Sequence, residues 1–253
     1  MATRLVILSG PSCVGKSPLV AAVKKYRSEV KFVQATVIKS KESRYNKPRP
    51  DELAVWDNPD NWRTMAEIET LKNDRRFVVD YCHGFAQVID LDKIINAPTD
   101  AVLMESYYTM AQKIVKSDYL TGVDIKTVFL SPISCQEIPA LNNDLPAAVK
   151  SLMMFKQYRR AEFHGRAIDN VWLTDMRHRV DDAFNEIKVA CNYDYVIVNH
   201  DGEGSPNWRR KNDGTFFDKP TCDAELAMDC LAALLAGETP KNAEHWQCDL
   251  IRE

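Results

Sequence analysis

The chain has 253 residues, of which 45% are hydrophobic and 27% are charged, and its formal net charge is -3. This length suits one sizeable α/β domain or a core with an inserted subdomain, and the composition excludes disordered and fibrous proteins. The small negative charge gives no overall attraction to nucleic acid or to an anionic membrane, although local basic clusters remain compatible with either.

Seven cysteines, an odd number, are spread along the chain with no C-x-x-C pair. Because a structural zinc site needs closely spaced ligands and a disulfide framework shows dense, even spacing, we expect reduced and mostly buried thiols. The five histidines show no H-E-x-x-H spacing, so no metal cluster is expected. The chain opens on a strand pattern and holds no apolar run of bilayer length, which favours a cytoplasmic protein with no membrane partner.

The first part of the chain alternates strand and helix patterns. Leu5–Leu8 is a continuous apolar run that predicts a strand buried on both faces, and the apolar spacing of Lys16–Tyr26 predicts a helix. Residues 34–60 carry many charges and three prolines and are expected to be loop-rich. A helix is expected at 62–72 and a strand at Phe77–Val79.

The same alternation continues through the middle of the chain. Ala101–Met104 and Thr127–Leu130 are short apolar runs that predict core strands, with a helical stretch at 107–117 between them. Residues 147–190 are rich in helix formers and arginine, contain no proline and are followed by a last expected strand at Tyr195–Val198. Strands that alternate with helices predict an α/β fold with a mostly parallel sheet.

The last part of the chain has a different composition. Residues 200–223 are rich in turn formers and predict an extended surface loop. Within it, Trp208–Lys211 joins an aromatic to basic residues, a pattern of base stacking with phosphate contact or, alternatively, of a solvated loop tip. A closing helix at 223–236 is expected to end at Gly237. Its leucines are expected to share one face, and they are Leu226, Leu231, Leu234 and Leu235.

The stretch between the first strand and the first helix carries the most specific pattern in the sequence. Gly10–Ser17 (GPSCVGKS) matches G-x-x-x-x-G-K-[ST] at every fixed position. Glycines let the backbone curl so that successive N–H groups face phosphate oxygens, and the N-terminus of the following helix adds its dipole. A chance match in a glycine-containing turn is the alternative, but both flanking elements are present. The pattern predicts binding of a nucleoside triphosphate.

Individual residues of this stretch have expected roles. Lys16 is expected to reach the β- and γ-phosphates of ATP, and the hydroxyl of Ser17 is expected to bind Mg²⁺. Pro18 is compatible with the pattern because the first turn of a helix has no intrahelical N–H bond to lose. The residues expected to contact the triphosphate are Gly10, Ser12, Cys13, Val14, Gly15, Lys16, Ser17 and Pro18.

Three segments, in the same order, resemble the guanylate kinase-like branch of the P-loop nucleoside monophosphate kinases. ILSGPSCVGKSPL is similar to the phosphate loop of that family, and SRYNKPRPDE (43–52) is similar to its T-T-R-x-P-R-x-G-E acceptor segment. RHRVDDAFNEI…YDYVIVN (177–199) is similar to its R-L-x-x-A-x-x-E-I…Y-D-Y-V-I-V-N close. The resemblance covers about residues 1–200, and residues 200–253 extend beyond it.

The resemblance implies a domain organisation and an activity. It implies a P-loop core of residues 1–33 and 98–253, with a mostly parallel sheet flanked by helices. It also implies an inserted acceptor-binding subdomain at 34–97 and an arginine-bearing lid at about 142–180. The implied activity is transfer of the γ-phosphoryl group of ATP to a nucleoside monophosphate, with Mg²⁺ as the metal.

The resemblance further implies an acceptor site. Arg49 matches the second acceptor arginine, and Arg44 stands two residues from the position of the first. Asp80 matches a carboxylate that faces the acceptor base, and Glu105 matches an acidic residue near the base or the metal, bound directly or through water. Each carboxylate follows an apolar strand, so capping of the next element is the alternative role. His83-Gly84, in place of a tyrosine-glycine pair, leaves guanine specificity open.

Phosphoryl transfer needs in-line positioning and positive charge around three equatorial oxygens, which the planar, permanently protonated fork of arginine supplies. Arg179 matches the arginine of the R-L position in the family, and Arg166 lies in the expected lid. Asn199, after the last strand, is expected either near the adenine or at the start of a turn. The residues expected to be catalytic are Lys16, Arg49, Arg166 and Arg179. The other arginines of this region, for each of which a solvated basic helix face is the alternative, are Arg159, Arg160 and Arg177.

Three functions are compatible with these patterns. The first is an ATP-dependent phosphotransferase that acts on a small nucleotide. The second keeps ATP but transfers the phosphoryl group to a hydroxylated base or an end in DNA or RNA, and it is motivated by the altered acceptor segment, by residues 200–253 and by the Trp208–Lys211 run. The third is a non-catalytic guanylate kinase-like binding module, which the intact Gly15-Lys16-Ser17 argues against. The identity of the acceptor and the oligomeric state stay open.

Overall fold

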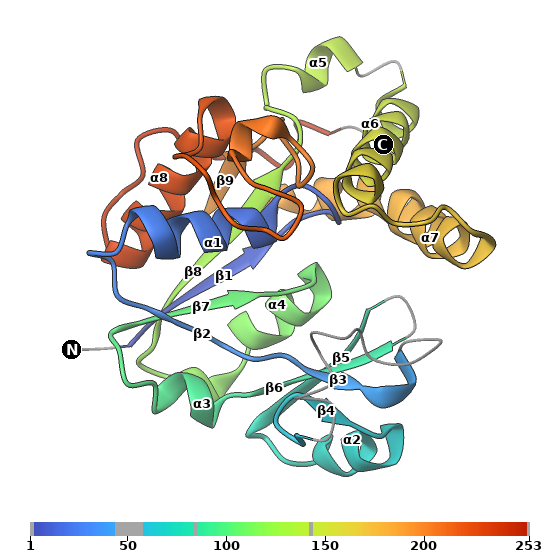
Figure 1. Ribbon diagram of the computed structural model, residues 1–253. Coiled ribbons are helices and arrows are strands. Elements are labelled where there is room, and N and C mark those ends of the chain that lie inside the picture. The colour runs from blue at the N-terminus through green and yellow to red at the C-terminus, as the bar shows by residue number, and fades with distance from the viewer. Residues whose placement is uncertain (1–2, 44–57, 83–84, 142–143, 252–253) are drawn as a thin grey trace. The chain divides into compact units, whose positions relative to one another are not determined.

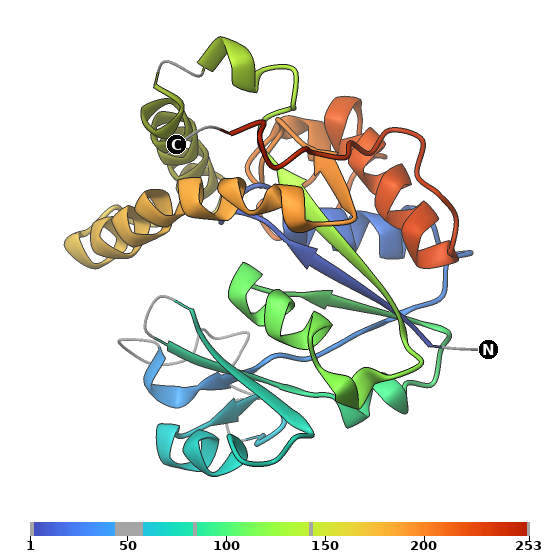
Figure 2. The same ribbon diagram turned by 180° about the vertical axis from the view of Figure 1, so that it is seen from behind.

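The computed structural model describes residues 3–43, 58–82, 85–141 and 144–251 (Figures 1 and 2). The chain divides into two compact units, Met1–Ile7 with Phe32–Ile125 and Leu8–Lys31 with Lys126–Glu253. No helix among the described residues has both the length and the apolar character needed to cross a bilayer.

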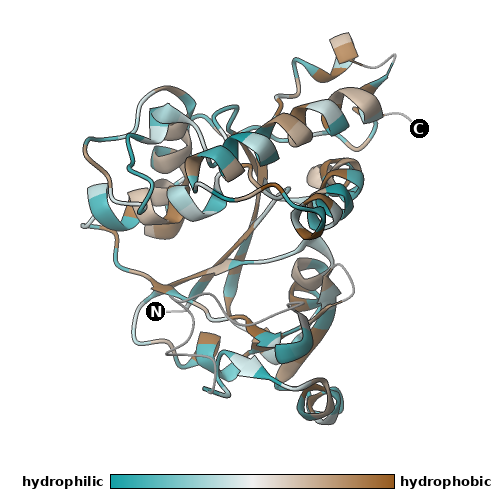
Figure 3. Ribbon diagram, turned by 45° about the vertical axis from the view of Figure 1, so that its right-hand side comes forward, coloured by the Kyte–Doolittle hydropathy of each residue, from teal (hydrophilic) through white to brown (hydrophobic). Residues whose placement is uncertain are grey.

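A five-stranded parallel sheet forms the core, in the order β2-β7-β1-β8-β9. Its strands are β1 (Arg4–Ser9), β2 (Val33–Gln34), β7 (Ala101–Glu105), β8 (Asp124–Ser131) and β9 (Tyr195–Val198). The apolar runs within β1, β7 and β8 are buried, as parallel strands covered on both faces require, and hydrophobic residues are brown in Figure 3. The prediction of an α/β fold with a parallel sheet flanked by helices is therefore confirmed.

The second unit carries most of the helices. They are α1 (Lys16–Tyr26), α5 (Ile138–Leu141), α6 (Leu145–Phe163), α7 (Asn170–Lys188) and α8 (Cys222–Ala236), with the 3-10 turns η4 (Ala190–Asn192) and η5 (Pro206–Trp208). Helices α6 and α7 have 19 residues each and pack against one another, and α1 packs against α8 (Figure 1). The helical character expected for residues 147–190 is confirmed, and the expected end of the last helix at Gly237 is also confirmed, because this residue caps α8 with a φ of 86°.

The first unit contains a second, smaller sheet in the order β4-β3-β6-β5. Its elements are β3 (Ile38–Ser40), β4 (Trp62–Arg63), β5 (Phe77–Cys82) and β6 (Phe85–Asp90), and α2 (Met65–Leu71) packs against β5 and β6. A local core of Ile38, Ile68, Ala86 and Val88 lies between the helix and the sheet residues. The remaining elements of this unit are η1 (Lys41–Ser43), α3 (Asp92–Ile95), α4 (Tyr108–Val115) and η3 (Asp118–Leu120).

The helix expected at 62–72 is shorter than predicted. Trp62 and Arg63 form β4, which pairs with β3, and the helix begins only at Met65. The reason is a capping box, in which the Thr64 hydroxyl accepts a hydrogen bond from the Glu67 N–H while the Glu67 carboxylate accepts one from the Thr64 N–H. The residues before Thr64 are therefore free to extend as a strand.

The leucines of α8 do not share one face. Leu226 is 46% exposed, whereas Leu231, Leu234 and Leu235 are buried. Nine residues separate Leu226 from Leu235, and at about 100° per residue this interval places the two side chains on opposite sides of a helix. The prediction was wrong for Leu226, and small residues such as Ala224 and Ala227 complete the buried face instead.

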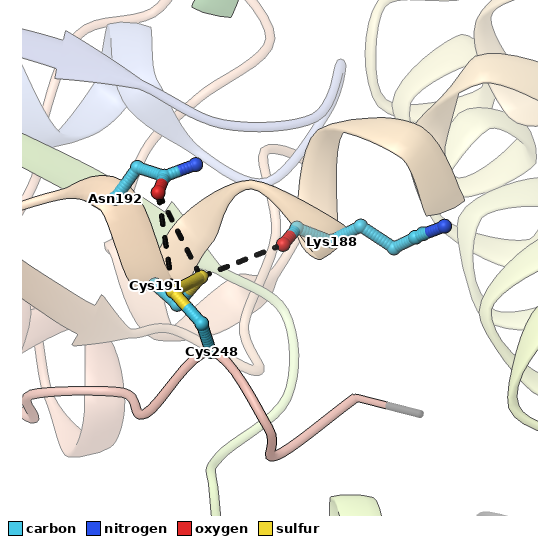
Figure 4. Close-up of a disulfide and its surroundings, with 4 residues drawn as sticks. All are labelled: Lys188, Cys191, Asn192 and Cys248. Atoms are coloured by element: carbon cyan, nitrogen blue, oxygen red, sulfur yellow. Dashed lines mark hydrogen bonds between the residues drawn. A yellow bond between two sulfur atoms is a disulfide. The ribbon is translucent and has the colours of Figure 1, made fainter. Parts of the chain in front are cut away.

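The prediction that the thiols are reduced and mostly buried was wrong. Cys191, in η4, and Cys248, near the end of the chain, form a disulfide beside the Lys188 carbonyl and the Asn192 side chain (Figure 4). Of the free cysteines only Cys13 and Cys230 are buried. The two bonded cysteines are 57 positions apart, and they become neighbours only because the chain returns toward β9 after α8. In this returning segment, Glu244 exchanges backbone hydrogen bonds of 2.8 and 2.7 Å with Val196 of β9.

Candidate functional site

The loop Gly10–Ser17, which we call the glycine loop, connects β1 to α1 and needs glycine at two positions. Gly10 has a φ of 140°, and a Cβ atom there would lie 2.3 Å from the carbonyl oxygen of Leu130. Gly15 has a φ of 105°, and a Cβ atom there would lie 2.6 Å from the Asn199 Nδ2 atom. Both the dihedral angles and the close neighbours exclude a larger residue. The predicted order of strand, tight loop and helix is confirmed.

Three consecutive carbonyl groups of the glycine loop are fixed by partners outside it. The carbonyl of Cys13 accepts the backbone N–H of Glu203 at 2.8 Å, and the carbonyl of Val14 accepts the Asn199 side-chain amide at 2.7 Å. The carbonyl of Gly15 accepts the N–H of Leu19 at 3.0 Å, as the first bond of α1.

These three bonds determine the direction of the next three N–H groups. In a trans peptide the carbonyl and the following N–H point in opposite directions. The N–H groups of Val14, Gly15 and Lys16 therefore point away from the partners of the carbonyls, toward the other side of the loop. Within the described residues, those of Gly15 and Lys16 have no backbone acceptor, while that of Val14 is 3.4 Å from the Pro11 carbonyl. A row of N–H groups at a helix N-terminus is an anion-binding arrangement.

The Lys16 ammonium lies over the glycine loop. Its Nζ atom donates to the carbonyl of Gly10 and, at 2.9 Å, to the carbonyl of Pro11. The positive charge is thus held beside the first residues of the loop. Ser17 is exposed in the first turn of α1, and Pro18 is buried in the same turn.

Two arginines from the long helices contact the glycine loop. Arg179, on α7, donates from Nη1 to the Ser12 hydroxyl at 3.2 Å and from Nε to Asp175 at 2.8 Å. Arg160, on α6, places Nη1 3.6 Å from the Cys13 sulfur, and its Nε lies 2.9 Å from a Glu203 carboxylate oxygen. Three cationic side chains therefore adjoin the loop, since Lys16 is the third.

The other arginines of this region lie elsewhere. Arg166 is exposed in the connection between α6 and α7, where its backbone N–H donates to the Ala161 carbonyl at 2.9 Å. Arg159 is exposed and lies 3.6 Å from Glu162, and Arg177 is exposed on α7. Of the predicted catalytic residues in the second unit, Lys16 and Arg179 are brought together at the glycine loop.

Two buried ionisable groups lie near the glycine loop. Glu186, on α7, is 3% exposed, and burial raises its pKa to about 7 although the charge of Lys16 acts in the opposite direction. Lys156, on α6, is 5% exposed and donates to the His200 carbonyl, and burial lowers its pKa to about 8. Such shifted groups are frequent at functional sites, although structural pairs also produce them.

A cavity of about 380 Å³ lies in the second unit, and Lys156 is one of the residues that line it. Leu152, Phe155, Lys156 and Arg159 of α6 form one wall, and residues 200–206 form the other. Its volume is within the range of small-molecule sites.

The predicted acceptor residues belong to the first unit or fall outside the described residues. Asp80, on β5, is 6% exposed, accepts a hydrogen bond from the Thr109 hydroxyl and lies 2.7 Å from the Lys113 ammonium. Glu105, at the end of β7, accepts a hydrogen bond of 3.0 Å from Gln34. Arg44, Arg49 and His83-Gly84 lie outside the described residues. Their roles as acceptor ligands stay predictions.

Both interpretations of the Trp208–Lys211 run, base stacking with phosphate contact and a solvated loop tip, were wrong for Trp208. Trp208 is fully buried, and its Nε1 atom donates to the Gly202 carbonyl at 2.6 Å. Arg210 donates to the Glu203 carbonyl at 2.9 Å, and its guanidinium carbon lies 4.9 Å from the centre of the Phe163 ring. The composition of residues 200–223 predicted a surface loop, because composition cannot indicate that this segment packs on the glycine loop and on α6.

Sequence reasoning missed the polar face of α6. Lys156 and Arg160 are spaced by four residues and therefore lie on one face of the helix, and His164, its C-cap residue, follows at the same interval. Arg160 and His164 both pair with Glu203, the latter at 3.3 Å. The sequence shows the repeated interval of four, but it gives no indication that Glu203, about forty positions away, contributes to this face.

The comparisons with known proteins give a distant structural similarity. No protein-family model matches the sequence, and no curated protein matches it. Among solved structures, the chain is similar to the crystal structure of guanylate kinase from Anaplasma phagocytophilum, with 15% identity and a TM-score of 0.47, over 95% of this chain and 87% of that one. Function therefore has to be inferred from the geometry of the glycine loop.

Proposed function

We propose that this protein is an ATP-dependent phosphotransferase that moves the γ-phosphoryl group of ATP to a nucleotide-type acceptor. The observation that carries the proposal is the glycine loop, in which the carbonyls of Cys13, Val14 and Gly15 are bonded outward and the next N–H groups point the other way. An ammonium and two guanidinium groups adjoin the same loop. This combination suits a polyphosphate, because its charge is distributed over several adjacent oxygens.

In the proposed reaction the chain binds and orients the phosphates. The N–H groups of Gly15 and Lys16 bind phosphate oxygens, while the Lys16 ammonium moves from its carbonyl partners to the outer phosphates. Arg179 stabilises charge that develops during transfer, and Arg166 joins it in the arginine-bearing lid proposed at about 142–180. Such groups act mainly by positioning and electrostatic stabilisation.

The first turn of α1 fits a magnesium ion bound with the triphosphate. Ser17 presents an exposed hydroxyl beside the N–H row, and an oxygen ligand of this kind suits Mg²⁺. Glu105 is the proposed carboxylate partner, directly or through water. When bound, the ion would neutralise negative charge on the β- and γ-phosphates.

We place the acceptor in the subdomain of residues 34–97, inserted in a core of 1–33 and 98–253. The separate sheet β4-β3-β6-β5 and its own apolar core support a subdomain that packs as a unit. Arg44, Arg49 and Asp80 are the proposed acceptor ligands. A small nucleotide is the proposed acceptor, because the net charge of -3 and the burial of Trp208 argue against a polynucleotide. The proposed location is the cytoplasm.

The test combines binding and transfer. Calorimetry is expected to show Mg·ATP binding by the wild type. Lys16→Met is expected to raise the Kd about 100-fold, because a charged hydrogen-bond donor to the phosphates is lost. Lys24→Met, an exposed position on the same helix, is the matched control and is expected to bind normally. Circular dichroism checks that both variants are folded.

Transfer is measured with γ-labelled ATP and a panel of nucleoside monophosphates. Label in at least one monophosphate is expected. If the label appears in DNA or RNA alone, the acceptor is a polynucleotide and not a small nucleotide. If the wild type does not bind ATP, the proposal as a whole is contradicted.

A further inference from the structure

We infer that residues Gly202–Trp208, which we call the brace, hold the glycine loop in its phosphate-binding conformation, and that Trp208 is the central positioning residue. The inference rests on the proposed function, because positioning matters for nucleotide binding only if the loop binds a nucleotide. Every contact that carries it lies within the second unit.

The backbone of the brace binds the glycine loop directly. The Glu203 N–H donates to the Cys13 carbonyl at 2.8 Å, and this bond directs the following N–H, that of Val14, to the opposite side. The approach is close: a Cβ atom on Gly202 would lie 3.1 Å from the same carbonyl oxygen, and Gly202 has a φ of 62°. A side chain at this position would strain the left-handed backbone and crowd the Cys13 carbonyl, so the contact favours glycine.

The indole of Trp208 lies against Gly15. A Cβ atom on Gly15 would be 3.1 Å from the Trp208 Cζ2 atom, and the carbonyl carbon of Gly202 is 3.5 Å from the same point. The indole N–H bonds the Gly202 carbonyl at 2.6 Å, so one rigid side chain joins the first residue of the brace to the glycine loop. Because Trp208 is fully buried, it cannot move away without opening a large cavity.

The brace is anchored on α6 as well as on the loop. The Glu203 carboxylate pairs with Arg160 at 2.9 Å and with His164 at 3.3 Å. A Cβ atom on Gly204 would lie 2.6 Å from the Arg159 carbonyl oxygen, so the brace backbone touches the helix. The brace therefore connects α6 to the glycine loop. Its rigidity limits the directions in which the Gly15 N–H group can point.

The experiment compares two tryptophans. Trp208→Phe removes the indole N–H bond and part of the contact with Gly15. Trp246→Phe is the matched control, because Trp246 is 5% exposed and its indole N–H also makes a 2.6 Å bond, to Glu244, away from the glycine loop. Hydrogen exchange of residues 13–17 without nucleotide and the Kd for Mg·ATP are measured for both variants.

Trp208→Phe is expected to accelerate exchange at residues 13–17 about tenfold and to raise the Kd about tenfold, the effect of one lost hydrogen bond with its packing. Trp246→Phe is expected to change neither. Equal effects of the two substitutions would show that Trp208 only stabilises the fold, and no effect of Trp208→Phe would also overturn the inference.

A wild type that does not bind Mg·ATP would contradict the proposed function, and hydrogen exchange alone would then decide whether the brace orders the loop. If Trp208→Phe does not fold, Ser205→Ala replaces it. Ser205 accepts the Asn207 N–H at 3.2 Å and donates to Asp201 at 2.9 Å, so its loss loosens the brace more mildly. An increase of about threefold in exchange and in Kd is expected, and unchanged values would overturn the inference.

Discussion

Glu186→Gln is expected to increase stability at pH 8 and to leave it nearly unchanged at pH 4.5. Glu186 is 3% exposed, and burial raises the pKa of its carboxyl from 4.5 to about 7, although Lys16 lowers it. Between these values the folded state binds more protons than the unfolded state, so the free energy of unfolding falls as pH rises through this window. At pH 8 the loss amounts to about 3 kcal/mol, at 1.36 kcal/mol for each pH unit between the two pKa values. Glutamine is neutral at every pH and avoids this loss.

Urea denaturation of the wild type and of Glu186→Gln at pH 4.5, 6 and 8 measures the difference. The curves are expected to coincide at pH 4.5 and to separate progressively above it. Glu67→Gln checks the sign, because hydrogen bonds from the backbone and side chain of Thr64 lower the pKa of Glu67. Relative to the wild type, Glu67→Gln is expected to lower the free energy of unfolding more at high pH than at low pH. A difference between the wild type and Glu186→Gln that is the same at all three pH values would refute the reasoning.

Three further predictions concern buried groups and the disulfide. Because burial lowers the pKa of Lys156 to about 8 from 10.5, the unfolded state binds more protons between these values, and stability is expected to rise with pH there. Lys156→Met is expected to abolish that rise in urea denaturation between pH 7.5 and 10.5. Reduction of the Cys191–Cys248 disulfide is expected to cost about 4 kcal/mol of unfolding free energy, from the entropy of opening its 57-residue separation. Denaturation with and without dithiothreitol measures this cost, and a Cys191→Ser, Cys248→Ser double variant is expected not to respond to the reductant. Leu231→Ala, at a fully buried position, is expected to cost about 3 kcal/mol, whereas Leu226→Ala, at a position 46% exposed, is expected to cost less than about 1 kcal/mol. Comparable losses for the two leucines in thermal denaturation would contradict the assignment of the buried face.

Local patterns in the sequence predicted the parts of the fold that depend on neighbouring residues. The run Leu5–Leu8 and the spacing of Gly10, Gly15 and Lys16 were sufficient to predict strand, loop and helix. The sequence also indicates the start of α2, because Thr64 and Glu67 have the spacing of a capping box. The helix predicted at 62–72 nevertheless began before this box. Local signals thus fail mainly at element boundaries.

The features that the sequence did not reveal depend on distant pairs. Trp208 is buried and lies against Gly15, and nothing within residues 200–223 indicates that neighbour. Cys191 and Cys248 are joined because the chain after α8 returns to β9. The direction of the loop N–H groups likewise depends on Asn199 and on the brace, which are more than 180 positions from the loop. Such contacts follow from tertiary packing rather than from local propensity.

The pairing of Glu244 with Val196 has a consequence for association between copies of the chain. Strand β9 lies at one border of the parallel sheet, where unpaired backbone groups offer a template for a strand of another molecule. The returning segment uses both the N–H and the carbonyl of Val196, so lateral addition of a foreign strand at this point would have to displace it. A polypeptide that stopped at Ala236 would leave those groups open, so we expect the segment that follows α8 to hinder aggregation along this border.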